Sequence, residues 1–456
     1  MKKKYVRWTL WTIASPFILF VILCILIYLP PIQNFLVDKA AVYASEATGM
    51  NISVGRISLS FPLNLVVTDV DAASPHNDTL LSVRRLQVNV QLLPLLKKQV
   101  EVDGISLQGA TVNSNDLIHG MKLNGTLGEL FISSHGVALD PETAIVNKVL
   151  LKDTDLSLCL NDTAAVDTAA SDTTYWKIIL QDIDLQNVSF ALDMPLDSLS
   201  LAASLDNAIL RDGLIDLHKS AYSLQTFRIK NGRVRYDSGK PLAADSLPSG
   251  LDPSHIALTD IGVKLDSLYY EGRNMKAIIS QFVLKERSGV EIVSATGRMV
   301  SNDKVLRVPS LKLETRDSYL ELNAAMDWNA LDFKGEGLVS ARLMADIGKP
   351  DVVRFMGRMD EKFVRQYPSE PLRIRTGIDG DLNKLKLTTL TAELPGALGL
   401  FARGELTHLT DSLLRGGDIT LEAETKDLKF VSTFHTERAW KANLRWRALK
   451  WARTCC

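Results

Sequence analysis

The chain has 456 residues, of which 46% are hydrophobic, so it carries enough apolar material to bury a sizeable core. Its 52 basic and 53 acidic side chains give a net charge of -1, which provides no overall field to attract nucleic acid or a polyanionic substrate. We therefore expect no nucleic-acid partner. The four cysteines, Cys24, Cys159, Cys455 and Cys456, have a spacing that builds neither a disulfide framework nor a zinc site.

A long apolar segment follows the basic N-terminus. No charged residue occurs between Arg7 and Asp38, and a helix starting at Trp8 is long enough to cross the ~30 Å hydrocarbon layer of a membrane. The positive-inside rule places residues 1–7 in the cytoplasm and the rest of the chain across the membrane. We predict a transmembrane signal-anchor helix over residues 8–29 of a single-pass membrane protein whose body is exported. Its anchoring residues are Trp8, Trp11, Phe17, Leu23 and Tyr28.

A cleaved signal peptide is the alternative to an anchor. The apolar region of a signal peptide runs about 7–15 residues, and small residues mark its cleavage site. Here the apolar run is longer than that, and Pro30 and Pro31 occupy the positions where a cleavage site would have small residues. The sequence therefore favours an uncleaved anchor.

A second, amphipathic helix is predicted over residues 30–49. Pro31 suits the first turn of a helix, and Gly49 provides a stop. Between them apolar residues recur at helical spacing, namely Ile32, Phe35, Leu36, Ala40, Tyr43 and Ala47. A membrane-surface helix and an ordinary linker helix both fit this pattern.

The following range, 50–434, alternates apolar and polar residues as β-strands do. The alternation is nearly unbroken from Ile57 to Val67 and returns from Leu86 to Leu92. Polar stretches from Asn161 and from Ser238 interrupt the strands. One helix is predicted between Pro350 and Pro368, from the spacing of Val352, Phe355, Met356, Met359 and Phe363.

A degenerate repeat recurs within this range. An apolar-x-apolar pair, a short polar or Gly break and another such pair occur in ISLQGATVN from Ile105, IDLQNVSFAL from Ile183 and FRIKNGRVRY from Phe227. We interpret the repeats as strand pairs separated by their breaks, which favours one long antiparallel sheet over a βαβ fold.

No motif for catalysis, metal binding or phosphate binding stands out. The seven histidines are scattered singly, and there is no nucleophile elbow, Walker loop or dinucleotide fingerprint. We expect a non-enzymatic protein with no catalytic residue, no metal and no cofactor. A membrane-tethered hydrolase whose site residues converge from distant positions stays an alternative.

The apolar face of the strands is the informative feature. A second sheet could cover it as an ordinary sandwich core, or it could line a half-pipe that contacts acyl chains. For the second hypothesis the candidate groove-lining residues are Leu59, Phe61, Leu63, Leu65, Val67, Leu86, Val88 and Val90.

The segment from Ser45 to Val70, directly after the anchor, resembles the N-terminus of the AsmA-like superfamily, particularly its TamB members. The resemblance is carried by Gly49, Gly55, Arg56, Ile57, Phe61, Pro62, Asp69 and Val70. It implies an inner-membrane, single-pass protein with a periplasmic body, whose twisted β-sheet forms a taco-like hydrophobic groove that conveys phospholipid between the inner and outer membranes. It equally implies a scaffold that assists outer-membrane protein insertion and secretion beside an outer-membrane β-barrel partner.

The C-terminal range departs from that family. TamB-type proteins are much longer and end in a domain that nothing here matches. Residues 435–456 form a basic tail, which as a helix would place Trp440, Leu444 and Trp451 roughly on one face. An out-of-frame or truncated end is the alternative that the abrupt change in composition favours.

Overall fold

The computed structural model describes residues 39, 41–42, 45–46, 48–60, 64–74, 79–91, 102–114, 120–138, 142–161, 175–239, 250–333, 336–356, 361–427, 430 and 449–451. These residues form mainly β-strands with few helices, which confirms the predicted fold class at that level. The chain divides into two compact units, Met1–Leu196 (unit 1) and Asp197–Cys456 (unit 2). The boundary falls inside the range 50–434 that the sequence assigned to one body.

The predicted anchor at 8–29 lies outside the described residues. Six residues of the predicted 30–49 helix are described as helical, namely Lys39, Ala41, Val42, Ser45, Glu46 and Thr48. The backbone turns at Gly49, whose φ is 69° and whose N–H donates to the Ser45 carbonyl at 2.9 Å. Among the described residues, no helix combines the length and the apolar character that crossing a membrane requires.

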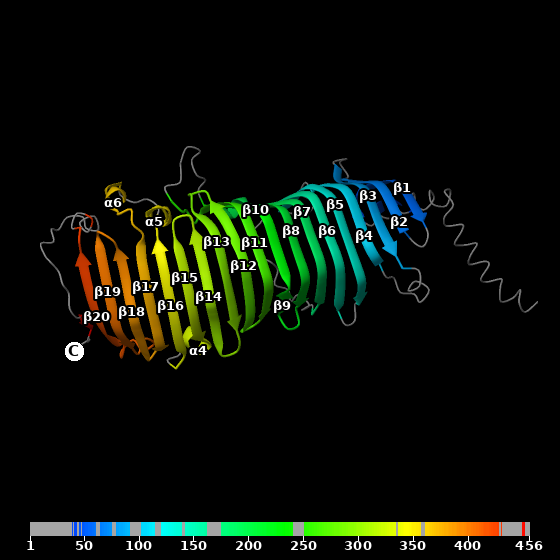
Figure 1. Ribbon diagram of the computed structural model, residues 1–456. Helices are drawn as coiled ribbons and strands as arrows, with labels where there is room; N and C mark the ends of the chain where they lie inside the picture. The colour runs from blue at the N-terminus through cyan, green and yellow to red at the C-terminus, as the bar shows by residue number, and fades with distance from the viewer. Residues whose placement is uncertain are drawn as a thin grey trace, which may run out of the picture. The chain divides into compact units, whose positions relative to one another are not determined.

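Unit 1 contains seven strands that pair in chain order (Figure 1). They are β1 (Asn51–Ser60), β2 (Asn64–Ala73), β3 (Thr79–Val90), β4 (Val102–Asn113), β5 (Met121–Ala138), β6 (Thr143–Leu160) and β7 (Lys177–Met194). Neighbours from β1 to β6 are antiparallel, as predicted. The pair β6–β7 is parallel, with Thr143 opposite Lys177 and Cys159 opposite Asp193, and here the antiparallel expectation does not hold.

The length of the connection accounts for the parallel pair. Antiparallel neighbours can be joined by a tight turn, whereas parallel neighbours need a connection long enough to return to the start of the strand. Residues 161–176 separate β6 from β7. These sixteen residues exceed the dozen or so that a parallel connection needs, whereas a hairpin can be closed by two.

Unit 2 contains a longer sheet, whose strands lie side by side in chain order from β11 to β20 (Figure 1). The short β9 and the longer β10 lie end to end between β8 and β11. The strands are β8 (Leu199–Asp216), β9 (Ala221–Leu224), β10 (Thr226–Ser238), β11 (His255–Glu271), β12 (Asn274–Glu286), β13 (Glu291–Ser301), β14 (Val305–Thr315), β15 (Tyr319–Asp327), β16 (Leu338–Ile347), β17 (Leu372–Asp381), β18 (Lys384–Leu394), β19 (Leu398–Thr407), β20 (Gly416–Thr425) and β21 (Leu449–Trp451).

Strand β21 corrects one hypothesis about the tail. Residues Leu449–Trp451 pair antiparallel with β20, and Trp451 lies opposite Gly417. The helical interpretation of the tail is therefore wrong for these three residues, because the free edge of β20 offers backbone donors and acceptors that a strand can satisfy. The other tail residues lie outside the described part of the chain.

The described helices are short and lie at strand ends. They are the 3-10 turn η1 (Pro195–Asp197), α4 (Trp328–Leu331), α5 (Lys349–Met356) and α6 (Glu361–Gln366). The single helix predicted between Pro350 and Pro368 corresponds to α5 and α6, which flank residues 357–360 outside the described set. Both ends of the prediction agree with the structure.

Two small hydrophobic clusters anchor the strand ends of unit 2. In the larger one, Phe363 and Tyr367 pack with Phe430 against Leu394 and Ala397 at the β18–β19 turn. The rings of Tyr367 and Phe430 meet edge-on at 5.7 Å, and burial raises the pKa of the Tyr367 hydroxyl. The smaller cluster, by the β16 and β18 ends, contains Ala330, Val339 and Leu385.

A buried carboxylate fixes α5 to the β14–β15 turn. Asp351 is 1% exposed and accepts hydrogen bonds from the hydroxyls of Thr315 and Ser318. Arg354 bridges Asp351 at 3.1 Å and Asp317 at 2.7 Å. Burial of the Arg354 guanidinium lowers its pKa, but the hydrogen bonds to the two carboxylates outweigh this effect and raise it.

We predict that Asp351→Ala releases α5 from the sheet. The substitution leaves the Thr315 and Ser318 hydroxyls without their acceptor and Arg354 with Asp317 alone, at a cost of about 1–3 kcal/mol. Hydrogen exchange should show lost protection of the α5 amides. Glu361→Ala is the control, because the Glu361–Arg365 pair is exposed and contributes at most ~0.5 kcal/mol. Equal protection in both variants would contradict this account of α5 docking.

Candidate functional site: the apolar faces of the two sheets

Cross-strand pairing arranges the aliphatic residues of unit 1 in rows. Residues that pair across neighbouring strands share a face of the sheet, so each row crosses β1 to β7 in line. One row consists of Leu59, Leu65, Val88, Ile105, Ile132, Val149 and Ile183, and the next of Ile57, Val67, Leu86, Leu107, Leu130, Leu151 and Leu185. Both rows are wholly aliphatic.

Two further rows continue along the same strands. They are Val54, Val70, Val83, Ala110, Leu127, Thr154 and Val188, and Ile52, Ala72, Leu81, Val112, Gly125, Leu156 and Phe190. Only Thr154 and Gly125 in them are not hydrophobic. We call the four rows together the apolar face of unit 1.

Rows of polar residues lie between the aliphatic ones. One consists of Arg56, Thr68, Arg85, Gln108, Glu129, Lys152 and Gln186, and another of Ser53, Asp71, Ser82, Thr111, Thr126, Asp155 and Ser189. Because side chains alternate between the two faces of a strand, these rows belong to the opposite face. The sheet of unit 1 therefore has one aliphatic and one polar face.

The breaks of the sequence repeat lie inside single strands. ISLQGATVN belongs to β4, IDLQNVSFAL to β7 and FRIKNGRVRY to β10, so the interpretation of each repeat as a strand pair is wrong. At each break one residue adopts a left-handed conformation. Gly109 has a φ of 62°, Asn187 of 51° and Asn231 of 53°.

Such a residue allows the apolar pairs on its two sides to share a face. In β4 the apolar positions are odd before the break (Ile105, Leu107) and even after it (Ala110, Val112). Uninterrupted alternation would send the second pair to the polar face. A left-handed residue acts as a bulge, which interrupts the alternation and turns the following side chains to the other face. We therefore infer that Gly109 keeps both apolar pairs of β4 on the apolar face.

The breaks line up across unit 1. The residues aligned there are Gly55, Asp69, Arg84, Gly109, Gly128, Asp153 and Asn187, of which Asp69, Gly109, Asp153 and Asn187 have a positive φ. Neighbouring side chains are close there: a Cβ added at Gly55 would lie 2.9 Å from that of Asp69, and the Asn187 amide donates to Asp153 at 2.8 Å. Gly55 and Asp69, two residues of the family resemblance, thus have a structural role.

The predicted groove-lining residues fall on this face where they are described. Leu59, Leu65, Val67, Leu86 and Val88 all lie in the two wholly aliphatic rows. Val90 follows them on β3, opposite Val102. Phe61 and Leu63 lie outside the described residues. Sequence reasoning missed the positions of β4 to β7 on this face. The apolar pairs of the repeat in β4 and β7 could have identified some of them.

Unit 2 has an apolar face of the same kind. Two adjacent rows cross β8 and then β10 to β20. The first is wholly apolar and consists of Ala208, Ile229, Val263, Phe282, Ala295, Leu313, Leu320, Ala345, Ile374, Ala392, Leu400 and Ala423. The second consists of Leu210, Phe227, Leu265, Ile279, Gly297, Leu311, Leu322, Leu343, Thr376, Leu390, Ala402 and Leu421.

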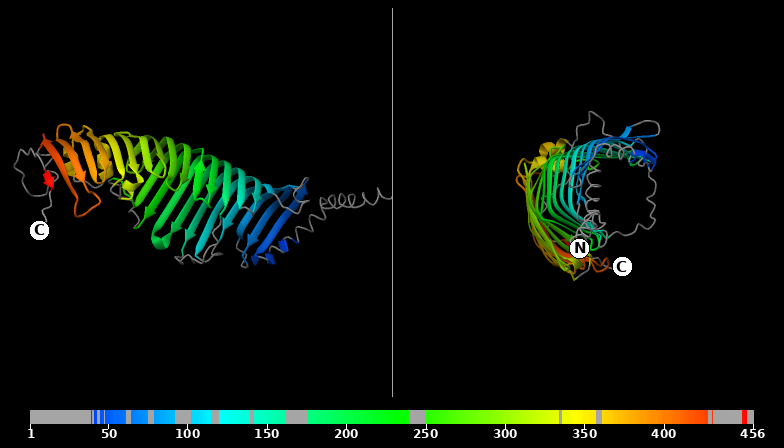
Figure 2. Two further views of the ribbon diagram at one scale, coloured as in Figure 1. Left: turned by 90° about the horizontal axis from the view of Figure 1, so that it is seen from below. Right: turned by 90° about the vertical axis from the view of Figure 1, so that its right-hand side faces the viewer.

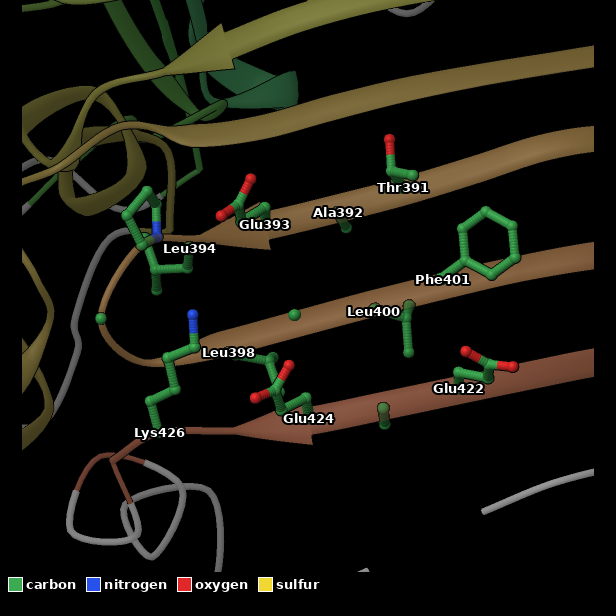
Figure 3. Close-up of a pocket in the computed structure, with 14 residues that line it drawn as sticks. Thr391, Ala392, Glu393, Leu394, Leu398, Leu400, Phe401, Glu422, Glu424 and Lys426 are labelled. Atoms are coloured by element: carbon green, nitrogen blue, oxygen red, sulfur yellow. The ribbon is translucent and has the colours of Figure 1, made fainter. Parts of the chain in front are cut away.

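The two faces separate clearly at β18 to β20. Figure 3 shows Glu393, Glu422 and Glu424 beside a pocket of about 450 Å³ at this end of the sheet. These carboxylates share a face because Glu393 and Glu424 both pair with Gly399, and Glu422 pairs with Phe401 two positions along. A Cβ at Gly399 would meet nothing within 4 Å, so the polar face is hollow there.

No second layer of described elements covers these apolar faces. Figures 1 and 2 show the strands of each unit as a single layer, and the described strands contact chiefly their hydrogen-bonded neighbours. Leu81 and Ile105 are 37% exposed and Phe190 is 38% exposed. A packed sandwich is therefore not found in the described parts of the chain.

Perturbed pKa values do not mark a separate reactive site. The pKa values of the Tyr269 and Tyr319 hydroxyls are raised, first by hydrogen bonds to Glu271 and Glu321 two positions along the same strand. These four side chains belong to exposed or half-buried residues, so the shifts report local pairing. Within the described residues, no group of His, Cys, Asp and Glu side chains is arranged to hold a metal ion.

No protein-family model matches the chain, and no curated protein matches it. The resemblance to the AsmA-like superfamily therefore stays a prediction.

We predict that the break in β4 tolerates Asn but not Val. Gly109→Val forces a β-branched residue into the left-handed region beside Arg84, whose Cβ would lie 3.2 Å from the new Cβ, at a cost of about 1–2 kcal/mol or more. Gly109→Asn should cost less, since Asn adopts this conformation at positions 187 and 231. Hydrogen exchange of the β3 and β4 amides measures the difference. Equal destabilisation by both substitutions would contradict the role of the left-handed conformation.

Proposed function

We propose that this chain is an inner-membrane-anchored β-groove protein that shields phospholipid acyl chains and conveys them between the inner and outer membranes. The observation that supports the proposal most directly is the set of apolar rows: two are wholly aliphatic across the seven strands of unit 1, and one is wholly apolar across twelve strands of unit 2. Ordinary surface strands do not repeat aliphatic residues at the same register over so many neighbours.

The energetics favour an apolar occupant. Aliphatic surface in water costs ~25 cal/mol per Å², and each methylene group that leaves water gains ~0.8 kcal/mol. With neighbouring strands ~4.8 Å apart, the rows span roughly 30 Å in unit 1 and roughly 50 Å in unit 2. An acyl chain lying on a row could therefore remain in apolar contact while it moves from one strand to the next.

The protein needs no reactive group for this function. The rows present almost entirely aliphatic and aromatic side chains, which bind acyl chains through shape and apolar area. Selectivity for a particular head group would then depend on other parts of the chain. The predicted anchor at 8–29 would hold one end of the groove at the inner membrane.

A scaffold for outer-membrane protein assembly is the second candidate. Among the described residues β1 pairs only with β2, and beyond Ile52, whose N–H donates to the Ser45 hydroxyl at 3.0 Å, its outer edge could accept a further strand. Client segments would bind by β-augmentation, through backbone hydrogen bonds with alternate side chains placed on the apolar face.

We predict that a photo-crosslinking residue at position 107 captures lipid, whereas one at position 108 does not. Leu107 belongs to the apolar face and Gln108, the next residue of β4, to the polar face, so the pair is matched for depth and strand. Irradiated full-length protein, purified from cells, would be examined by mass spectrometry for lipid adducts.

The same experiment separates the two candidate functions. Phospholipid adducts at Leu107 alone support the groove. Protein adducts at Leu107 without lipid favour the scaffold, and adducts at both positions in equal yield would show that the apolar face has no special role.

A further inference from the structure

A second hollow lies on the polar face of unit 2. It measures about 560 Å³ and is formed by β8, β10, β11 and β12. Its lining includes the exposed cations Arg228, Lys230 and Lys264 and the half-buried amides of Asn207 and Gln281. These side chains alternate with the row of Ile229 and Val263, so they point away from the apolar face.

The cations are placed where they repel one another. Arg228 lies directly opposite Lys264 in the β10–β11 register, and Lys230 follows Arg228 on the same face. Like charges directly opposite each other destabilise a sheet. None of the three forms an ion pair with a carboxylate within 4.0 Å in the described parts of the chain.

The one carboxylate in the lining is already engaged. Asp260 binds the Nζ atom of Lys285 at 2.9 Å, and this hydrogen bond is the main reason why the pKa of Lys285 is raised. Asp206 on β8 accepts a hydrogen bond from the Asn231 amide, which also lines the hollow. Neither carboxylate forms an ion pair with Arg228, Lys230 or Lys264 in the described parts of the chain.

An apolar side chain lies among these polar groups. Gly262 lies on the same face as Lys264, and a Cβ there would be only 2.8 Å from Val283 Cγ2, so the Val283 side chain occupies the space over Gly262. Arg228, Lys230 and Lys264 line the hollow together with Val283.

We propose that this hollow binds an oxyanion of the phosphate class. A phosphate group carries up to two negative charges and several acceptor oxygens, which match one forked guanidinium, two ammonium groups and neighbouring amide donors. A single carboxylate would balance only one of the three charges. The site is independent of the proposed lipid groove, because it lies on the opposite face. Its phosphate could belong to a soluble anion or to a lipid head group.

Binding of inorganic phosphate to the purified full-length chain tests the proposal. Sodium phosphate, compared with sodium chloride at equal ionic strength, should raise the thermal unfolding midpoint and give saturable heat in calorimetry. The double variant Arg228→Gln and Lys264→Gln should bind phosphate roughly tenfold more weakly or worse, since it lacks two charged donors. It should fold normally, because the substitutions remove a repulsion.

A charge-matched control removes two cations elsewhere in unit 2. Lys312→Gln with Lys384→Gln breaks exposed pairs with Glu321 and Glu405, at 3.9 Å and 3.2 Å, and should bind phosphate as the unmodified chain does. Equal responses to phosphate and chloride, or equal weakening in both double variants, would overturn the proposal. Displacement of bound phosphate by short-chain phosphatidylglycerol would identify a lipid head group as the source, and its failure would indicate a soluble anion.

Discussion

Cross-strand register couples every strand of each unit to its neighbours, and the separation of faces depends on it. A slip of one residue in β4 would place Gln108 between Leu86 and Leu130 and would move Leu107 to the polar face. The left-handed breaks add a second condition, since Gly109 has to lie opposite Arg84 and Gly128 opposite Asp153. A strand with the wrong register would misplace both its aliphatic residues and its break. The apolar face and the breaks thus specify the same alignment.

The sequence predicts the parts of this arrangement that have a local cause. Alternation around Leu59 and Leu86 identifies strands with one apolar face, and Pro350 and Pro368 delimit the helical segment. The breaks are harder to interpret, because Asn, Asp and Gly favour the left-handed conformation both in hairpin turns and inside a bulged strand. Asn231 followed by Gly232 has the signature of a turn, yet β10 runs through it. The parallel pairing of β6 with β7 has no local signal, since it depends on contacts between residues distant in sequence.

The two faces give the sheets two independent chemistries. The aliphatic rows provide apolar contact area but no directional bonds. They therefore suit a ligand that is chemically uniform along its length, such as an acyl chain. The polar face offers charged groups at fixed spacing, and some of them pair with a neighbour, as Lys285 does with Asp260. Around the hollow on β10 and β11, Arg228 lies directly opposite another cation, Lys264. The helices of unit 2 are confined to strand ends, which leaves both faces open along most of the sheet.

The parallel pair has a consequence for how unit 1 reaches its native state. Adjacent antiparallel strands joined by short connections bring together residues that are near in sequence, so such pairs can form early and extend strand by strand. The β6–β7 pair instead joins Thr143 to Lys177 and keeps a comparable separation throughout, so closing it requires a long loop to be ordered first. Folding of β1 to β6 can therefore run ahead of β7. Until β7 is added, the edge of β6 presents unpaired backbone donors and acceptors that other chains could use.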